Sequence, residues 1–252
     1  MIKDLKIEIL LFYYDRPKMA SNFAIASVFE SHYTNWELTL IDDSSNQDGE
    51  KIVKEFKEKN PHYNERGKVK VIATGDSLEE KEKRGGSLFG SFANTAIEKH
   101  SNADICLMLC DDDALHKNYL KELNSYYLEN SEVIYSYCRV AIYNPLDHEN
   151  IFELQKIHLL DEPSEHPLNA SGSIPNACCL VDASQVSWRR DSFLKDKIFF
   201  DFPLTSNLDA DLYQKMSDKW GDCKENKILG QYKAVFTDQL GSRDQIYKIL
   251  ET

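Results

Sequence analysis

Short apolar runs alternate with amphipathic stretches over the first half of this sequence. Apolar residues recur at helical spacing between the runs, as Ile25, Val28 and Phe29 do. Alternation of strand and helix implies right-handed crossovers and a mainly parallel sheet. The runs rich in strand formers are 7–12, 36–41, 69–72 and 105–109. The predicted helices cover Ile25 to Phe29, Ile52 to Phe56, Ser87 to Lys99 and Tyr119 to Glu129.

The alternation loosens in the second half of the chain. Two strand-like segments, 133–138 and 141–143, lead into a polar stretch that contains three prolines. A further strand-like segment, 177–181, comes directly before Asp182. No internal repeat, low-complexity tract or linker interrupts the sequence, so we expect one α/β domain over residues 1–252.

Composition and charge narrow the function classes. The chain has 252 residues, of which 42% are hydrophobic and 11% aromatic, which supports a filled core. Its formal net charge of -12 argues against nucleic acid as a partner, although a bound cation can admit a small phosphate ligand. No apolar stretch approaches the roughly 20 residues that span a bilayer. The first six residues are too charged for a secretory signal. We therefore expect a cytoplasmic protein, with its six cysteines reduced.

Three consecutive carboxylates, Asp111, Asp112 and Asp113, follow the apolar segment 105–109. Adjacent acids repel one another, so a fold keeps them together for a reason. The usual reasons are a hard divalent cation or a helix N-terminus. Ligands of α/β proteins bind at the carboxyl ends of the strands, which favours the cation.

A second acidic pair, Asp42 and Asp43, follows the predicted strand 36–41, and Tyr14 follows the first strand. In a parallel sheet, all of these side chains meet at one edge. An aromatic ring, a carboxylate that accepts from a base N–H and a metal-binding pair would fit a nucleoside diphosphate. For Asp42 and Asp43 alone, a helix cap with a solvated surface acid explains the pattern equally well.

Several segments resemble one enzyme family in their order and spacing. They are residues 7–17, 35–45, 94–98, 109–113 and 237–239. Together they resemble the family 2 glycosyltransferases, and among these the spore-coat polysaccharide type. The resemblance implies the GT-A fold and inverting transfer of a sugar from a nucleotide-sugar to an acceptor hydroxyl. It also implies a nucleotide-sugar-binding half, 1–115, and an acceptor-binding half, 116–252.

The resemblance assigns donor-binding roles to residues of the first half. Tyr14 would stack on uracil, with Phe12 also at the donor site, and Asp43 would accept from the base N3–H. Arg84 would reach the nucleotide from a flexible loop, unless it is one charge in a solvated run. Asp111 would contact the ribose or bridge to the metal through water.

The resemblance also implies a divalent cation, Mn²⁺ or Mg²⁺, that spans the donor diphosphate. Asp112 would bind this cation, and Asp113 is the alternative if the family's Asp-x-Asp spacing applies. Cys110 stands where many family members have an acid.

Inverting transfer further needs a base that takes the acceptor proton. By resemblance this base is Asp209, with Asp211 as the alternative; Leu208 stands where many relatives have Glu. Asp182 would contact the acceptor, or else it ends a strand in a turn. Trp188 would line the acceptor pocket, or else it belongs to the core.

The predicted function is metal-assisted, inverting transfer from a UDP- or dTDP-sugar to a glycan, lipid-linked or small-molecule acceptor. One alternative is a nucleotidyltransferase. Such an enzyme usually has a glycine-rich loop with a basic residue after its first strand, where this chain has residues 13–17. The other alternative is a catalytically silent sugar-nucleotide or glycan-binding module, which the missing acid before Asp209 favours.

Overall fold

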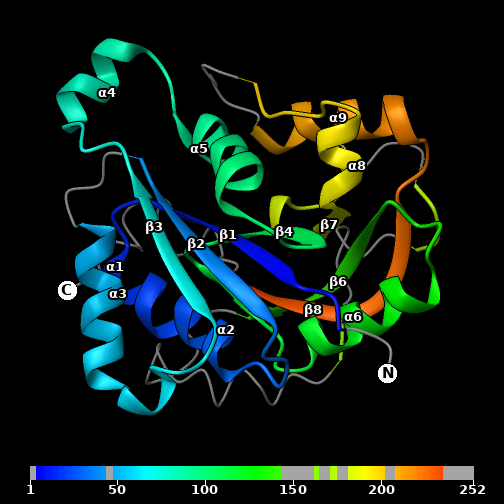
Figure 1. The fold of residues 1–252 in the computed structure, drawn as a ribbon, viewed down its shortest axis with the longest axis horizontal. Helices are drawn as coiled ribbons and strands as arrows, with labels where there is room; N and C mark the ends of the chain where they lie inside the picture. Colours follow the sequence, from blue (N-terminus) through cyan, green and yellow to red (C-terminus); the bar gives the residue numbers. More distant parts are fainter. Residues whose placement is uncertain are drawn as a thin grey trace.

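The computed structural model describes residues 4–43, 48–143, 162–164, 171–174, 181–201 and 208–234. An eight-stranded, curled sheet in the order β3-β2-β1-β4-β7-β6-β8-β5 forms its centre, with helices on both faces (Figure 1). The strands are β1 (Ile7–Tyr13), β2 (Trp36–Asp42), β3 (Lys68–Ala73), β4 (Ile105–Cys110), β5 (Asp113–Leu115), β6 (Tyr135–Tyr143), β7 (Val186–Arg189) and β8 (Lys224–Ala234).

Helices cover both faces of the sheet. In Figure 1, α1, α2, α3 and α6 lie below the sheet, whereas α4, α5, α8 and α9 lie above it. None of the helices in the described ranges is long and apolar enough to cross a membrane. The α-helices are α1 (Pro17–Met19), α2 (Ala26–Glu30), α3 (Gly49–Lys59), α4 (Leu78–Arg84), α5 (Phe89–Thr95), α6 (Tyr119–Glu129), α8 (Arg190–Lys195) and α9 (Leu208–Trp220). Shorter helical turns are η1 (Ala20–Ile25), η2 (Pro61–Tyr63), η3 (Ala96–His100) and η4 (Ala183–Gln185).

The first half of the chain forms the parallel part of the sheet. β1 pairs in parallel with β2 and β4, and β2 pairs in parallel with β3. Phe12 therefore lies between Ile41 and Cys110, and Tyr13 lies opposite Asp42. The four predicted strands are confirmed, as is the predicted helix α6. The carboxyl ends of β1, β2 and β4 meet at one edge.

The second half completes the sheet with mixed pairing. β7 is antiparallel to both β4 and β6, and β6 is parallel to β8. The prediction of two strands over 133–138 and 141–143 is wrong, because β6 continues without a break through Arg139. Most of the predicted strand 177–181, like residues 237–239, lies outside the described residues.

Two apolar layers pack against the two faces of the sheet. Ile9 and Leu11 of β1 belong to the layer covered by α2, α3 and α6. Leu10 and Phe12, which point to the opposite face, belong to the layer that contains residues of α5, α8 and α9. Burying such a side chain contributes about 1.5–3 kcal/mol, so both layers hold the strand ends in place. Trp188 is fully buried in the second layer, which confirms its assignment to the core.

Candidate functional site

Three acids close the carboxyl end of β4. Asp111 and Asp112 directly follow this strand, and Asp113 begins β5. All three side chains are buried, with residue exposures of 1–2%. Burying an ionised carboxylate is costly unless it is paired or coordinates a metal, so the partners of each acid define the site.

Arg16 binds two of these acids. Its Nη1 lies 2.8 Å from Oδ2 of Asp112, and its Nη2 lies 3.2 Å from Oδ1 of Asp111. The backbone N–H of Tyr14 donates to Oδ2 of Asp111 at 2.8 Å. Asp15 adopts a left-handed conformation with φ of 52°, which aspartate tolerates better than most residues. Arg16, in the turn after β1, thus places its positively charged guanidinium against both acids. The sequence pattern did not predict this role.

Asp113 belongs to a second network. It accepts from Ser184 Oγ at 2.9 Å and lies 3.4 Å from the Lys233 ammonium. The same ammonium contacts Asp182 at 2.8 Å, and Ser184 Oγ also contacts Asp182 at 3.0 Å. Asp182 caps the turn η4 through a capping box with Gln185, so its predicted turn role is present. A role of Asp182 toward an acceptor stays a prediction.

The acids can hold a divalent cation. Ligand atoms of Cys110, Asp112 and Asp113 lie within 4.8 Å of one another. Burial, together with the neighbouring Asp112, raises the pKa of Asp111 although Arg16 opposes the shift. The pKa of Asp113 is raised for the same reasons, against the opposing Lys233. Both shifts disfavour the ionised acids, and a bound cation would stabilise their ionised forms.

The donor atoms fit a hard cation through their oxygens. Carboxylates are the ligands that Mn²⁺ and Mg²⁺ prefer, whereas a thiol is a soft ligand. Burial raises the pKa of the Cys110 thiol well above its usual value, and the surrounding acids raise it further. Cys110 thus stays protonated beside the two carboxylates and is not expected to bind a hard metal ion.

Asp43 directly follows β2 and is completely buried. Its Oδ1 lies 2.8 Å from Arg84, and its Oδ2 accepts from Ser87 Oγ at 2.8 Å and from the Leu88 N–H at 2.9 Å. Lys81 lies 3.1 Å away. Burial alone would raise the pKa of Asp43, but these hydrogen bonds and Lys81 lower it, so the group stays ionised. The interpretation of Asp43 as a solvated surface acid is wrong.

The expectation of a flexible loop at Arg84 is also wrong, because Arg84 is the last residue of α4. This helix begins with a reciprocal cap: Glu80 accepts from the Ser77 N–H, and Ser77 Oγ accepts from the Glu80 N–H. The Ser-x-x-Glu spacing was visible in the sequence and was the signal for this helix. Asp42 has a capping role, since its Oδ2 accepts from the N–H of Gly49 at the start of α3.

Tyr14 presents an aromatic face at this edge. It is 39% exposed, more than any other large hydrophobic residue in the described ranges. The Lys81 ammonium lies 4.3 Å from its ring centroid, so one lysine links Tyr14 to Asp43. Phe12 lies beneath the surface, with its ring 5.3 Å from that of Phe89 in an edge-to-face contact. Its contact with a donor stays a prediction.

Asp209 lies in the first turn of α9 and is half-buried, whereas Asp211 is exposed. Tyr213 follows one turn later and is fully buried. Burial raises the pKa of the Tyr213 phenol, and the nearby Asp209, Asp182 and Cys110 raise it further. The roles of Asp209 and Asp211 toward an acceptor stay predictions.

Comparison with known proteins gives a result at the level of structure. No protein-family profile matches the sequence, and no curated protein is similar to it in sequence. TarS from S. aureus (residues 1–349) in complex with UDP-GlcNAc superposes with a TM-score of 0.63 at 16% identity, covering 92% of this chain and 59% of TarS. The UDP complex of the same protein gives a TM-score of 0.63 at 15% identity, covering 92% and 61%.

A second neighbour is the mannosyltransferase PcManGT from Pyrobaculum calidifontis in complex with GDP-Man and Mn²⁺. Its TM-score is 0.56 at 12% identity, covering 94% of this chain and 59% of that enzyme. The chain thus spans about three-fifths of the length of these structures. Its curled, mostly parallel sheet flanked by helices is the fold of the GT-A glycosyltransferases.

Proposed function

We propose that this chain is an inverting glycosyltransferase that moves a sugar from a UDP- or dTDP-sugar to an acceptor hydroxyl. One observation carries the proposal: buried acids, an exposed aromatic ring and a buried ionised carboxylate meet at the carboxyl edge of the parallel strands. Ligands of open α/β sheets bind at this edge. Neighbours with the same fold were crystallised with UDP-GlcNAc and with GDP-Man and Mn²⁺.

The donor base is assigned to Tyr14 and Asp43. The exposed ring of Tyr14 stacks on the base, and the ionised Asp43 accepts from its N3–H. Lys81 and Arg84 hold Asp43 in place from α4. The first half of the chain, residues 1–115, supplies this donor site.

Asp112 and Asp113 would hold Mn²⁺ or Mg²⁺. The ion would neutralise the diphosphate and stabilise it as a leaving group. Asp111 keeps the turn after β1 in place through the Tyr14 N–H and Arg16. Arg16 neutralises part of the acid charge in the donor-free protein and contributes a fixed positive charge at the diphosphate.

Asp209 is assigned as the general base. It removes the proton of the acceptor hydroxyl while the hydroxyl oxygen bonds to the anomeric carbon. The bond from that carbon to the diphosphate breaks on the opposite face, and the configuration inverts. Its half-buried place in the first turn of α9 leaves it reachable by an acceptor. The half formed by residues 116–252, including Asp182 and Asp211, receives the acceptor.

An activity assay with radiolabelled nucleotide-sugars and Mn²⁺ tests the proposal. We expect slow donor hydrolysis by the wild-type chain and a loss of about 10²–10⁴-fold in Asp209→Asn, with UDP binding retained. Asp218→Asn, an exposed acid near the end of the same helix, is the matched control and keeps activity. Release of pyrophosphate would indicate a nucleotidyltransferase. Binding without any turnover would indicate a silent module, and equal losses in both variants would remove Asp209 from the role of base.

A further inference from the structure

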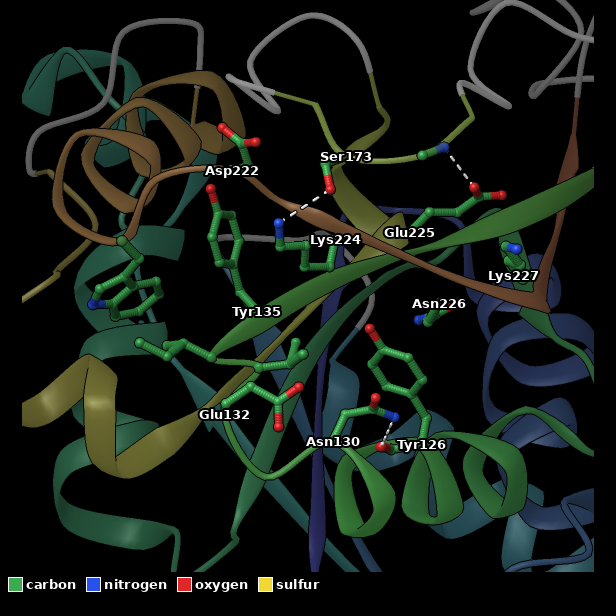
Figure 2. Close-up of a pocket in the computed structure, with 14 residues that line it drawn as sticks. Tyr126, Asn130, Glu132, Tyr135, Ser173, Asp222, Lys224, Glu225, Asn226 and Lys227 are labelled. Atoms are coloured by element: carbon green, nitrogen blue, oxygen red, sulfur yellow. Dashed lines mark hydrogen bonds between the residues drawn. The ribbon is translucent and has the colours of Figure 1, made fainter.

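A cavity of about 520 Å³ lies at the edge of the sheet opposite the acids. Figure 2 shows the side chains that line it. β6 runs in the same direction as β4, because β7 is antiparallel to both. The cavity lies where β6 and β8 begin, at Tyr135 and Lys224, whereas the acids follow the end of β4. Its volume falls within the range of about 300–1,000 Å³ that small-molecule sites occupy.

Aromatic rings from two helices line the cavity. Tyr126 comes from α6 and Trp220 is the last residue of α9; both are half-buried. The Trp220 ring packs against Tyr135, another lining residue, with ring centroids 5.5 Å apart, and its Nε1–H donates to Asp196 Oδ2 at 2.7 Å. These contacts fix the orientation of the half-buried indole. An aromatic face suits the C–H surface of a sugar ring.

Charged groups surround these rings. The lining holds three acids, Glu132, Asp222 and Glu225, and two bases, Lys224 and Lys227. Arg139, outside the lining, pairs with Glu225 at 2.7 Å, so the remaining charges of the lining balance. Within the described ranges, the carboxylates of Glu132 and Asp222 have no hydrogen bond or ion pair. A phosphate ligand would require excess positive charge, and a metal ion excess acid. Balanced donors and acceptors around aromatic faces match a neutral polyhydroxylated ligand.

A β-bulge shapes one wall of the cavity. Residues 225–229 of β8 span the same stretch as residues 137–139 of β6, and Lys227 within the bulge has a φ of 61°. This conformation is unfavourable for a long side chain, and bulges of this kind redirect side chains next to functional sites. Asn226 secures the bulge, since its Nδ2 donates to Ser136 Oγ and its Oδ1 accepts from the Ile228 N–H. The bulge places Lys227 in the cavity lining.

We propose that this cavity is a second carbohydrate site that binds a mono- or disaccharide unit. Trp220 and Tyr126 supply the stacking faces, and Glu132, Asp222 and Lys227 supply hydrogen bonds to the hydroxyls. Binding here does not compete with a nucleotide at the acids, because the two sites lie at opposite edges of the sheet. One consequence rests on the proposed transferase function: the site would hold a glycan chain at a distance from its reacting end.

Tryptophan fluorescence tests the site directly. Of the three tryptophans, Trp36 and Trp188 are at most 3% exposed, so a saccharide in the cavity alters mainly the emission of Trp220. We expect a saturable change with at least one of cellobiose, maltose and N,N′-diacetylchitobiose, with dissociation constants near the millimolar range. The titration needs no nucleotide and no metal, so its failure would leave the proposed transferase function untouched.

Variants separate the cavity from non-specific effects. Glu132→Gln combined with Asp222→Asn removes two charged acceptors and should weaken binding about tenfold or more. Glu129→Gln, an exposed acid of α6 outside the cavity, is the matched control and binds as the wild type does. Lys227→Gly should weaken binding while raising the unfolding midpoint, because glycine favours this conformation. Because Trp220→Phe lacks the fluorescent reporter, calorimetry measures saccharide binding to this variant.

Two results would overturn the assignment. The first is no fluorescence or calorimetric signal with any of the three disaccharides at concentrations well above millimolar. The second is a signal that the Glu132→Gln, Asp222→Asn double variant retains in full. Manganese binding to the cavity in the absence of saccharide, lost in that same variant, would identify a metal site instead.

Discussion

The replacement Arg16→Gln removes the positive charge between Asp111 and Asp112 while it keeps a polar side chain of similar length. Breaking a fully buried ion pair costs about 3–5 kcal/mol, because a buried charge loses its partner. An exposed pair contributes about 0–1 kcal/mol. The Arg16 side chain is 22% exposed, whereas its two acids are 2% and 3% exposed. We therefore expect a loss of about 2 kcal/mol in the free energy of unfolding.

Thermal and urea unfolding of both proteins measure this loss. For a chain of this size, about 2 kcal/mol corresponds to a decrease of about 4–8 °C in the unfolding midpoint. Lys51→Gln is the matched control: Lys51 is 66% exposed and lies 3.9 Å from Glu55, so its removal should change stability by less than about 0.5 kcal/mol.

Added Mn²⁺ provides the second arm of the experiment. Ligand binding to the native state raises stability by mass action. We expect Mn²⁺ to raise the unfolding midpoint of Arg16→Gln more than that of the wild type, because the variant lacks the competing guanidinium. Two results would refute the reasoning: unchanged stability in Arg16→Gln, or a variant that Mn²⁺ stabilises less than it stabilises the wild type.

Three further predictions concern the donor. Tyr14→Ala should weaken UDP binding about tenfold or more, since stacking on a base contributes about 1–3 kcal/mol; calorimetry with UDP and Mn²⁺ measures it, and unchanged affinity would contradict the stacking role. Asp43→Asn should lose the Arg84 and Lys81 ion pairs, lowering both the unfolding midpoint and UDP affinity; a variant that loses neither would argue against this assignment. Asp112→Asn should abolish the Mn²⁺-dependent part of UDP binding, and retention of that part would exclude Asp112 as a ligand.

The parallel half of the fold could be predicted from the sequence for a clear reason. β1, β2 and β4 are buried on both faces, so they read as short, mainly apolar runs rich in strand formers. β6 was predicted as two strands because Arg139 interrupts its apolar pattern. In the structure, Arg139 pairs with Glu225 of β8. The two residues are 86 positions apart in the sequence, so no local pattern reveals this contact.

Some residues of the candidate site could likewise be predicted from a local sequence pattern, and others could not. Asp111, Asp112 and Asp113 were recognisable, since three acids after an apolar run form a local pattern. Lys233 was not, because it meets Asp113 only through the pairing of β5 with β8. Arg16 was close in sequence to Tyr14, but its contact with Asp112 depends on the parallel pairing of β1 with β4.

Anomalous diffraction from crystals soaked with Mn²⁺ and UDP tests most directly whether these acids fix a nucleotide diphosphate through a cation. We expect one manganese peak within coordination distance of Asp112 or Asp113, with the diphosphate bound to it and the base against Tyr14. UDP bound elsewhere, or a peak absent from the acids while Arg16 still spans Asp111 and Asp112, would contradict the proposed transferase site.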